Sequence, residues 1–112
     1  MELSKRDKKA AREVIDKALQ RDFQRGLLEF DAILAKWKNQ EVDNRQSYYD
    51  IYSSVKKFDK YIARRYDDLR GSTYYITVLG LLHDGIIQEE DLSGFSDEVA
   101  QAIINHVNSL KE

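Results

Sequence analysis

The apolar residues of this chain recur every three or four positions, with polar residues between them. The first stripe comprises Ala11, Ile15, Leu19, Phe23, Leu27, Phe30, Leu34 and Trp37. This spacing is typical of an amphipathic helix, so we expect helix from about residue 5 to about residue 39. Ser4, followed three residues later by Asp7, indicates where that helix begins.

Two residues inside this stripe predict an interruption. Glycine at position 26 costs about 1 kcal/mol in a helix interior, and Asp22 could cap a new helix. We therefore expect a kink or a break near residues 20–26. The pattern leaves open whether residues 5–39 form one helix or two.

A second stripe predicts a helix from about Asn44 to Arg70, after a polar turn at residues 39–44. Its inward positions are Tyr48, Ile51, Val55, Phe58, Ile62 and Leu69, and Tyr52 and Tyr66 widen it. The alternating spacings of three and four match packing against near-antiparallel neighbours. Gly71 suits the position after a helix and Ser72 suits an N-cap, so we expect a tight corner there.

The segment after this corner is ambiguous. Residues 73–79 are β-branched and aromatic types that favour a strand. No other segment alternates in the way that a partner strand would. We therefore predict a helix over residues 73–84, ended by Gly85. This helix is apolar on nearly all sides, so we expect it to be central in the fold.

The remaining pattern completes an all-α fold. A polar connection with an acidic turn at residues 89–91 leads to a last helix capped by Ser96. We predict one domain over residues 1–112, a bundle of four to five mostly antiparallel helices. The side chains expected to be buried are Phe30, Trp37, Phe58, Ile62, Leu79, Leu82 and Ile103.

Composition sets the compartment that we expect. The chain has no proline to interrupt its helices, and no cysteine to form a disulfide or a thiolate metal site. Its charged start lacks the apolar region of a secretory signal. The longest apolar stretch, Ile76 to Leu82, is too short to span a bilayer. We expect a cytoplasmic protein with no membrane insertion.

Metal and cofactor chemistry finds little support in the sequence. Residues 84–92 resemble the back half of an EF-hand calcium loop. If Gly85 were its invariant glycine, two ligand positions would fall on Gly80 and Leu82, whose side chains cannot coordinate. His83 and His106 lack metal-ligand spacing, and no nucleophile elbow or phosphate loop occurs. We expect no metal, no cofactor and no catalytic residue.

Tyrosine supplies the first candidate site, because all seven tyrosines lie within residues 48–75. Tyr48, Tyr52 and Tyr66 fall on the core stripe, whereas Tyr49 and Tyr61 fall off it. Exposed tyrosine beside long cationic side chains can bind protein surfaces and steer an acidic partner, including the acidic C-terminal third of a second copy. The predicted interaction patch comprises Tyr49, Lys56, Lys60 and Tyr61.

A basic helix face supplies an alternative. Lys56, Lys60 and Arg64 are spaced four residues apart and could contact a nucleic-acid backbone. The net charge of −2 and the pI of 5.7 favour an ordinary solvated face. A nucleic-acid-associated accessory protein is therefore the second hypothesis.

A polar cluster supplies the last hypothesis. Asp67 and Asp68 fall in the last turn of the predicted helix, where the helix dipole disfavours anions. Ion pairing with neighbouring arginines would explain them, but such local inconsistency can also mark a functional site. A small-ligand sensor or enzyme would use Arg64, Arg65, Asp67, Asp68 and Arg70. We rank it below a non-enzymatic protein-interaction or self-associating module, which is the first hypothesis.

Overall fold

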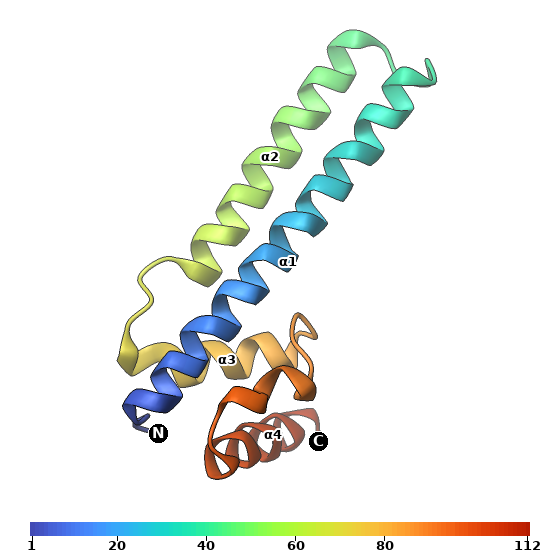
Figure 1. Cartoon of the computed structure of the whole chain (residues 1–112). Coiled ribbons are helices and arrows are strands. Elements are labelled where there is room, and N and C mark those ends of the chain that lie inside the picture. Colours follow the sequence, from blue (N-terminus) through green and yellow to red (C-terminus); the bar gives the residue numbers. More distant parts are fainter. The chain divides into compact units, whose positions relative to one another are not determined.

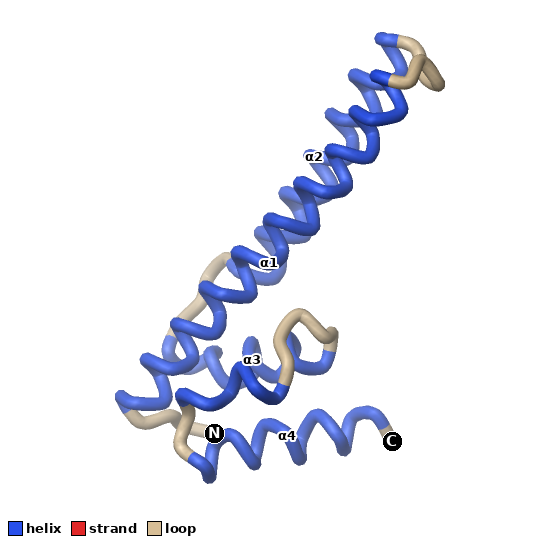
Figure 2. The backbone as a smooth tube through the Cα atoms, turned by 45° about the vertical axis from the view of Figure 1, so that its right-hand side comes forward, coloured by secondary structure: helices blue, strands red, loops and turns tan.

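The computed structural model describes all 112 residues, and it contains helices and connecting segments without any strand (Figures 1 and 2). The elements are α1 (Lys5–Lys38), α2 (Asn44–Tyr66), the 3₁₀ turn η1 (Gly71–Thr73), α3 (Tyr74–His83), the 3₁₀ turn η2 (Glu89–Gly94) and α4 (Asp97–Lys111). Helix accounts for 81% of the chain. The predicted all-α fold is confirmed, and so is helix rather than strand at α3.

The contacts divide the chain into two compact units. Unit 1 comprises Met1–Gln20 and Asp68–Glu112, and unit 2 comprises Arg21–Asp67. The division falls inside α1, which nevertheless continues as one helix of 34 residues. Of the kink or break predicted near residues 20–26, the break is therefore wrong, and the kink stays a prediction. The single domain over residues 1–112 stays a prediction.

Gly26 has a packing role that its helix propensity does not reveal. A Cβ atom at this position would lie only 2.6 Å from the ring of Phe58 on α2. Any larger residue would therefore require the Phe58 ring to move. The glycine makes room for this ring and does not interrupt α1.

The N-termini of α1 and α4 are joined through one buried carboxylate in unit 1. The Asp7 backbone N–H donates to Ser4 Oγ at 3.1 Å, which confirms the predicted start of α1. The Asp7 carboxylate in turn accepts from the Ser96 backbone N–H at 2.7 Å and from the Ser96 hydroxyl at 3.0 Å. Ser96 Oγ also accepts from the Val99 backbone N–H, which confirms the predicted cap of α4.

A closed apolar core fills unit 1. The buried side chains come from the first half of α1, from α3, from the segment around η2 and from α4. With Leu3, which precedes α1, they are Ala10, Ala11, Val14, Ile15, Ala18, Tyr75, Val78, Leu79, Leu81, Leu82, Ile87, Leu92, Phe95, Val99, Ile103 and Val107. Three of the residues predicted to be buried, Leu79, Leu82 and Ile103, are confirmed here.

The corner after α2 differs from its prediction. α2 ends at Tyr66, four residues before Arg70, and the left-handed residue that follows is Asp68, with φ 61°. Aspartate tolerates this conformation better than most residues with a side chain, so Gly71 is not needed for it. The N-cap of α3 is Thr73 and not Ser72. Gly85, with φ 78°, follows the end of α3 as predicted.

Unit 2 is an antiparallel hairpin made of the second half of α1 and of α2. At its turn, Asp43 caps α2 by accepting from the Gln46 backbone N–H at 2.7 Å. Trp37 Nε1 donates to Asn44 Oδ1 at 2.7 Å, which joins the two helices. Further along, the Phe58 ring lies 6.2 Å from Phe23 and 5.9 Å from Phe30, measured between ring centroids.

Burial in unit 2 is shallower than the sequence predicts. Trp37 is 41% exposed, so its predicted burial is wrong. Phe30, Phe58 and Ile62 are only partly buried. Tyr48 and Tyr52, placed on the core stripe by their spacing, are exposed. Each helix of a two-helix hairpin has one neighbour, which covers a narrower band than a bundle covers.

Candidate functional site

The predicted interaction patch is only partly open in the structure. Tyr49, Lys56 and Lys60 are exposed on α2. Tyr61 is partly buried, and its hydroxyl donates to the carboxylate of Asp22 on α1 at 3.1 Å. Tyr61 therefore joins the two helices instead of presenting its hydroxyl to a partner.

Tyr61 belongs to a buried polar cluster that sequence reasoning missed. Asp22 is 2% exposed and accepts from the hydroxyls of Tyr61 and Tyr66, the latter at 2.5 Å. The Arg25 guanidinium lies 2.9 Å from the same carboxylate and 5.0 Å from the centroid of the Tyr61 ring. The Arg65 guanidinium lies 5.4 Å from that centroid. The Asp22 carboxylate therefore has hydrogen-bond donors and a cationic partner within the cluster.

The protonation of the cluster follows from burial and from the Asp22 charge. Burial and the hydrogen bond to Asp22 raise the pKa of Tyr66 well above its usual value. Burial also raises the pKa of Tyr61, against the opposing influence of Arg25 and Arg65. For Arg25, burial disfavours the charged form, but Tyr61 and Asp22 outweigh it and raise the pKa. The tyrosines therefore stay neutral donors, and the cluster holds α1 and α2 together.

The sequence held only a weak signal for this cluster. Asp22 lies one position before Phe23 of the apolar stripe, and Arg25 follows it by one helical turn. That spacing indicates an i,i+3 ion pair but not its burial. The burial depends on Tyr61 and Tyr66, which come from another helix and meet Asp22 only after folding.

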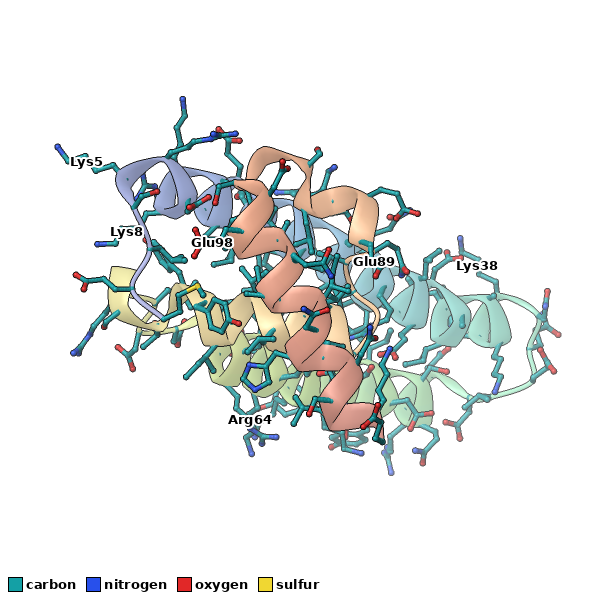
Figure 3. All side chains as sticks on the ribbon, turned by 90° about the horizontal axis from the view of Figure 1, so that it is seen from below. Lys5, Lys8, Lys38, Arg64, Glu89 and Glu98 are labelled. Atoms are coloured by element: carbon teal, nitrogen blue, oxygen red, sulfur yellow. The ribbon has the colours of Figure 1, made fainter.

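The residues predicted as a polar cluster do not form one site in unit 2. Arg64 is exposed, and Figure 3 shows its side chain pointing away from α2. Arg65 packs over Tyr61, and Asp67 is the exposed C-cap residue of α2. Asp68 and Arg70 belong to unit 1, where both are exposed. The enzyme or sensor reading of these residues stays a prediction.

The most distinctive surface of unit 2 is apolar. Six large side chains on one face of the hairpin are exposed to solvent, and we call this set the apolar face: Leu27, Leu34, Trp37, Tyr48, Tyr52 and Val55. Leu27 and Leu34 are seven residues apart on α1, and Tyr48 and Val55 are seven apart on α2. That spacing places each pair on one side of its helix.

A groove lies between the two helices at the end of this face nearest the hairpin turn. Its volume is about 360 Å³, and it is lined by Leu34, Trp37, Asn44, Ser47, Tyr48 and Ile51. Its lining is mostly apolar, with polar groups at the turn of the hairpin. The groove therefore suits an apolar side chain of a partner more than a charged ligand.

Other candidate chemistry is absent or simple. No group of three or more His, Asp or Glu side chains lies close enough to hold a metal ion. His83 Nδ1 lies 3.0 Å from Asp84 Oδ1, and the His106 ring lies 6.2 Å from the Tyr75 ring between centroids, tilted by 41°. None of the helices combines the length and the apolar character needed to cross a bilayer.

Comparison with known proteins adds no functional assignment. The chain matches no protein-family model, no curated protein and no solved structure. The apolar face and the Asp22 cluster are therefore interpreted from their own chemistry. The cluster holds two helices together, whereas the apolar face is exposed to solvent.

Proposed function

We propose that this protein is a non-enzymatic protein-interaction module that binds its partner through the apolar face of unit 2. The observation that carries the proposal is the exposure of six large apolar side chains on one side of an ordered hairpin. Contiguous exposed apolar patches beyond a few hundred Å² are rare on monomeric proteins and commonly mark interaction sites.

The composition of the face supports a protein partner. Trp37, Tyr48 and Tyr52 lie within it, and aromatic residues are enriched at protein interfaces. Tyrosine contributes apolar area while its hydroxyl stays hydrated, so such a face remains compatible with water until it is covered. None of the six residues is charged, which removes one cost of burying them.

The form of the face supports a helical partner. Leucines seven residues apart on α1, beside Tyr48 and Val55 at the same spacing on α2, make ridges at the period that packs against other helices. A helix from a partner can lie along the groove between these ridges. The proposal is therefore helix-to-helix binding rather than capture of a small molecule.

The test uses two leucines of α1. A photo-reactive amino acid replaces Leu34 on the apolar face or, as the control, Leu28. Leu28 is also exposed, but it lies about 100° further round α1 than Leu27 and so off the face. The full chain is irradiated in the cells that naturally make it. We expect covalent protein adducts from position 34 and few from position 28. Equal yields at the two positions, or no adduct at either, would contradict the proposal.

A further inference from the structure

We infer that the partner on the apolar face is a second copy of this chain, so that two hairpins together complete a four-helix bundle. This inference rests on the proposed function and names its partner. The hairpin supplies two helices that pack along one another, and a second hairpin supplies the two helices that are missing from a bundle.

The available area agrees with this arrangement. From the exposed fractions of its six side chains, the apolar face offers on the order of 700 Å² per copy, close to the roughly 800 Å² per partner of a specific interface. The 23 residues of α2 extend about 35 Å, which is long enough for several layers of side chains. The face is thus large enough for a dimer without contributions from other surfaces.

The periodicity of the face also fits a second copy. A two-fold interface brings the same patch of both copies together, so the patch must be complementary to itself. Leu27 with Leu34, and Tyr48 with Val55, repeat at seven residues on helices that run antiparallel. An identical pair of helices carries ridges of the same period, as this kind of packing requires.

The charges around the face favour a near-neutral partner of mixed sign. Asp31 follows Leu27 by one turn, and Lys38 follows Leu34 by one turn, so the α1 rim carries both signs. On α2, Lys56 lies over the Tyr52 ring at 5.3 Å, and Asp59 follows Val55 by one turn.

Unit 2 as a whole carries ten Lys and Arg against eight Asp and Glu. A strongly acidic or basic partner would meet like charges on either rim. A second copy carries the same mixture of positive and negative side chains, so opposite charges of the two copies can pair.

The test compares two adjacent leucines of nearly equal exposure. Leu27, on the face, is 65% exposed, and Leu28, turned away from it, is 62% exposed. The full chain and the variants Leu27→Lys and Leu28→Lys are measured by sedimentation equilibrium from low micromolar to high micromolar concentration. Far-UV circular dichroism checks that each variant keeps its helix content, and Tyr48→Lys serves as a second face variant.

We expect the wild-type chain to pass from its monomer mass of 13.1 kDa to twice that mass as its concentration rises. Leu27→Lys should raise the dissociation constant at least about tenfold, because it buries a lysine charge, whereas Leu28→Lys should change it by less than about twofold. A chain that stays monomeric throughout, or equal effects of the two variants, would overturn the inference.

The photo-crosslinking experiment separates this outcome from failure of the proposed function. A monomeric chain whose position 34 still forms selective adducts with a protein of another mass would overturn the second copy as partner, and the interaction surface would stand. Absence of selective adducts would contradict the interaction surface itself. Adducts of twice the chain mass, matched by reversible dimerisation, support both.

Discussion

The two units of this chain use the same helical pattern and bury it to very different extents. In unit 1, Val78, Leu81, Ile87 and Ile103 have almost no exposed surface. In unit 2, Leu27 and Tyr48 are 65% and 67% exposed. Unit 1 brings segments from several elements around one core, whereas unit 2 has only two helices. The number of neighbouring helices decides which apolar residues become core.

α1 makes the comparison within one continuous helix. Its first half buries Ala11, Ile15 and Ala18, and its second half exposes Leu27 and Leu34. Apolar residues recur every three or four positions in both halves. Hydrophobic periodicity therefore identifies the apolar side of a helix, but it does not tell what covers that side.

The largest expected effect is a core truncation in unit 1. Leu81→Ala should lower the free energy of unfolding by about 2–5 kcal/mol, because it leaves a cavity among fully buried neighbours. Leu27→Ala at dilute concentration should change it by less than about 0.5 kcal/mol, since its side chain is already hydrated. Urea unfolding followed by circular dichroism measures both. Equal costs would contradict the difference between the units.

The next effect concerns the buried carboxylate of unit 2. Asp22→Ala should cost about 2–3 kcal/mol, because Tyr61, Tyr66 and Arg25 lose their shared acceptor. Thermal unfolding gives the value, with Asp31→Ala, an exposed aspartate of the same helix, as the control. A loss no larger than that of the control would mean that the cluster does not hold α1 to α2.

A smaller effect tests the link between α1 and α4 in unit 1. Burial alone would raise the pKa of Asp7, but hydrogen bonds from Ser96 and Ser4 outweigh it and lower the pKa below the ordinary 3.8. The Asp7 carboxylate therefore binds a proton more readily in the unfolded chain than in the folded one. The stabilisation is complete above pH 3.8 and is lost as the pH falls through the lower folded pKa.

The Asp7→Asn variant measures this contribution. Its stability should fall less steeply than that of the wild type as the solution is acidified, because residue 7 no longer titrates. Chemical unfolding at a series of acidic pH values gives, for each protein, the slope of the free energy of unfolding against pH. Identical slopes would show that Asp7 has the same pKa in the folded and unfolded chains.

Local signals were enough to predict many element boundaries. Ser4 and Asp7 at the start of α1, Gly85 after α3 and Ser96 before α4 act through their own turn of backbone. These capping signals depend on neighbours in sequence, which a single chain displays directly. Helix at residues 74–83 was predicted in another way, against local residue types that favour a strand, because no partner strand occurs anywhere in the chain.

The errors arose where distant residues decide the outcome. Gly26 and Asp22 predicted a kink or a break in α1, but no break occurs, and Gly26 accommodates the Phe58 ring of α2. Trp37 was placed in the core because its stripe was assumed to face a complete bundle. The Asp22 cluster needed tyrosines from a second helix. The sequence displays none of these contacts.

Amide hydrogen exchange at low and high protein concentration tests most directly the claim that unit 1 is closed and unit 2 is completed by association. Exchange in residues 21–67 should slow as concentration rises, because a second hairpin covers and stabilises the helices. Exchange in residues 78–107 should stay nearly unchanged. Equal slowing in both regions, or no change in residues 21–67, would contradict the account.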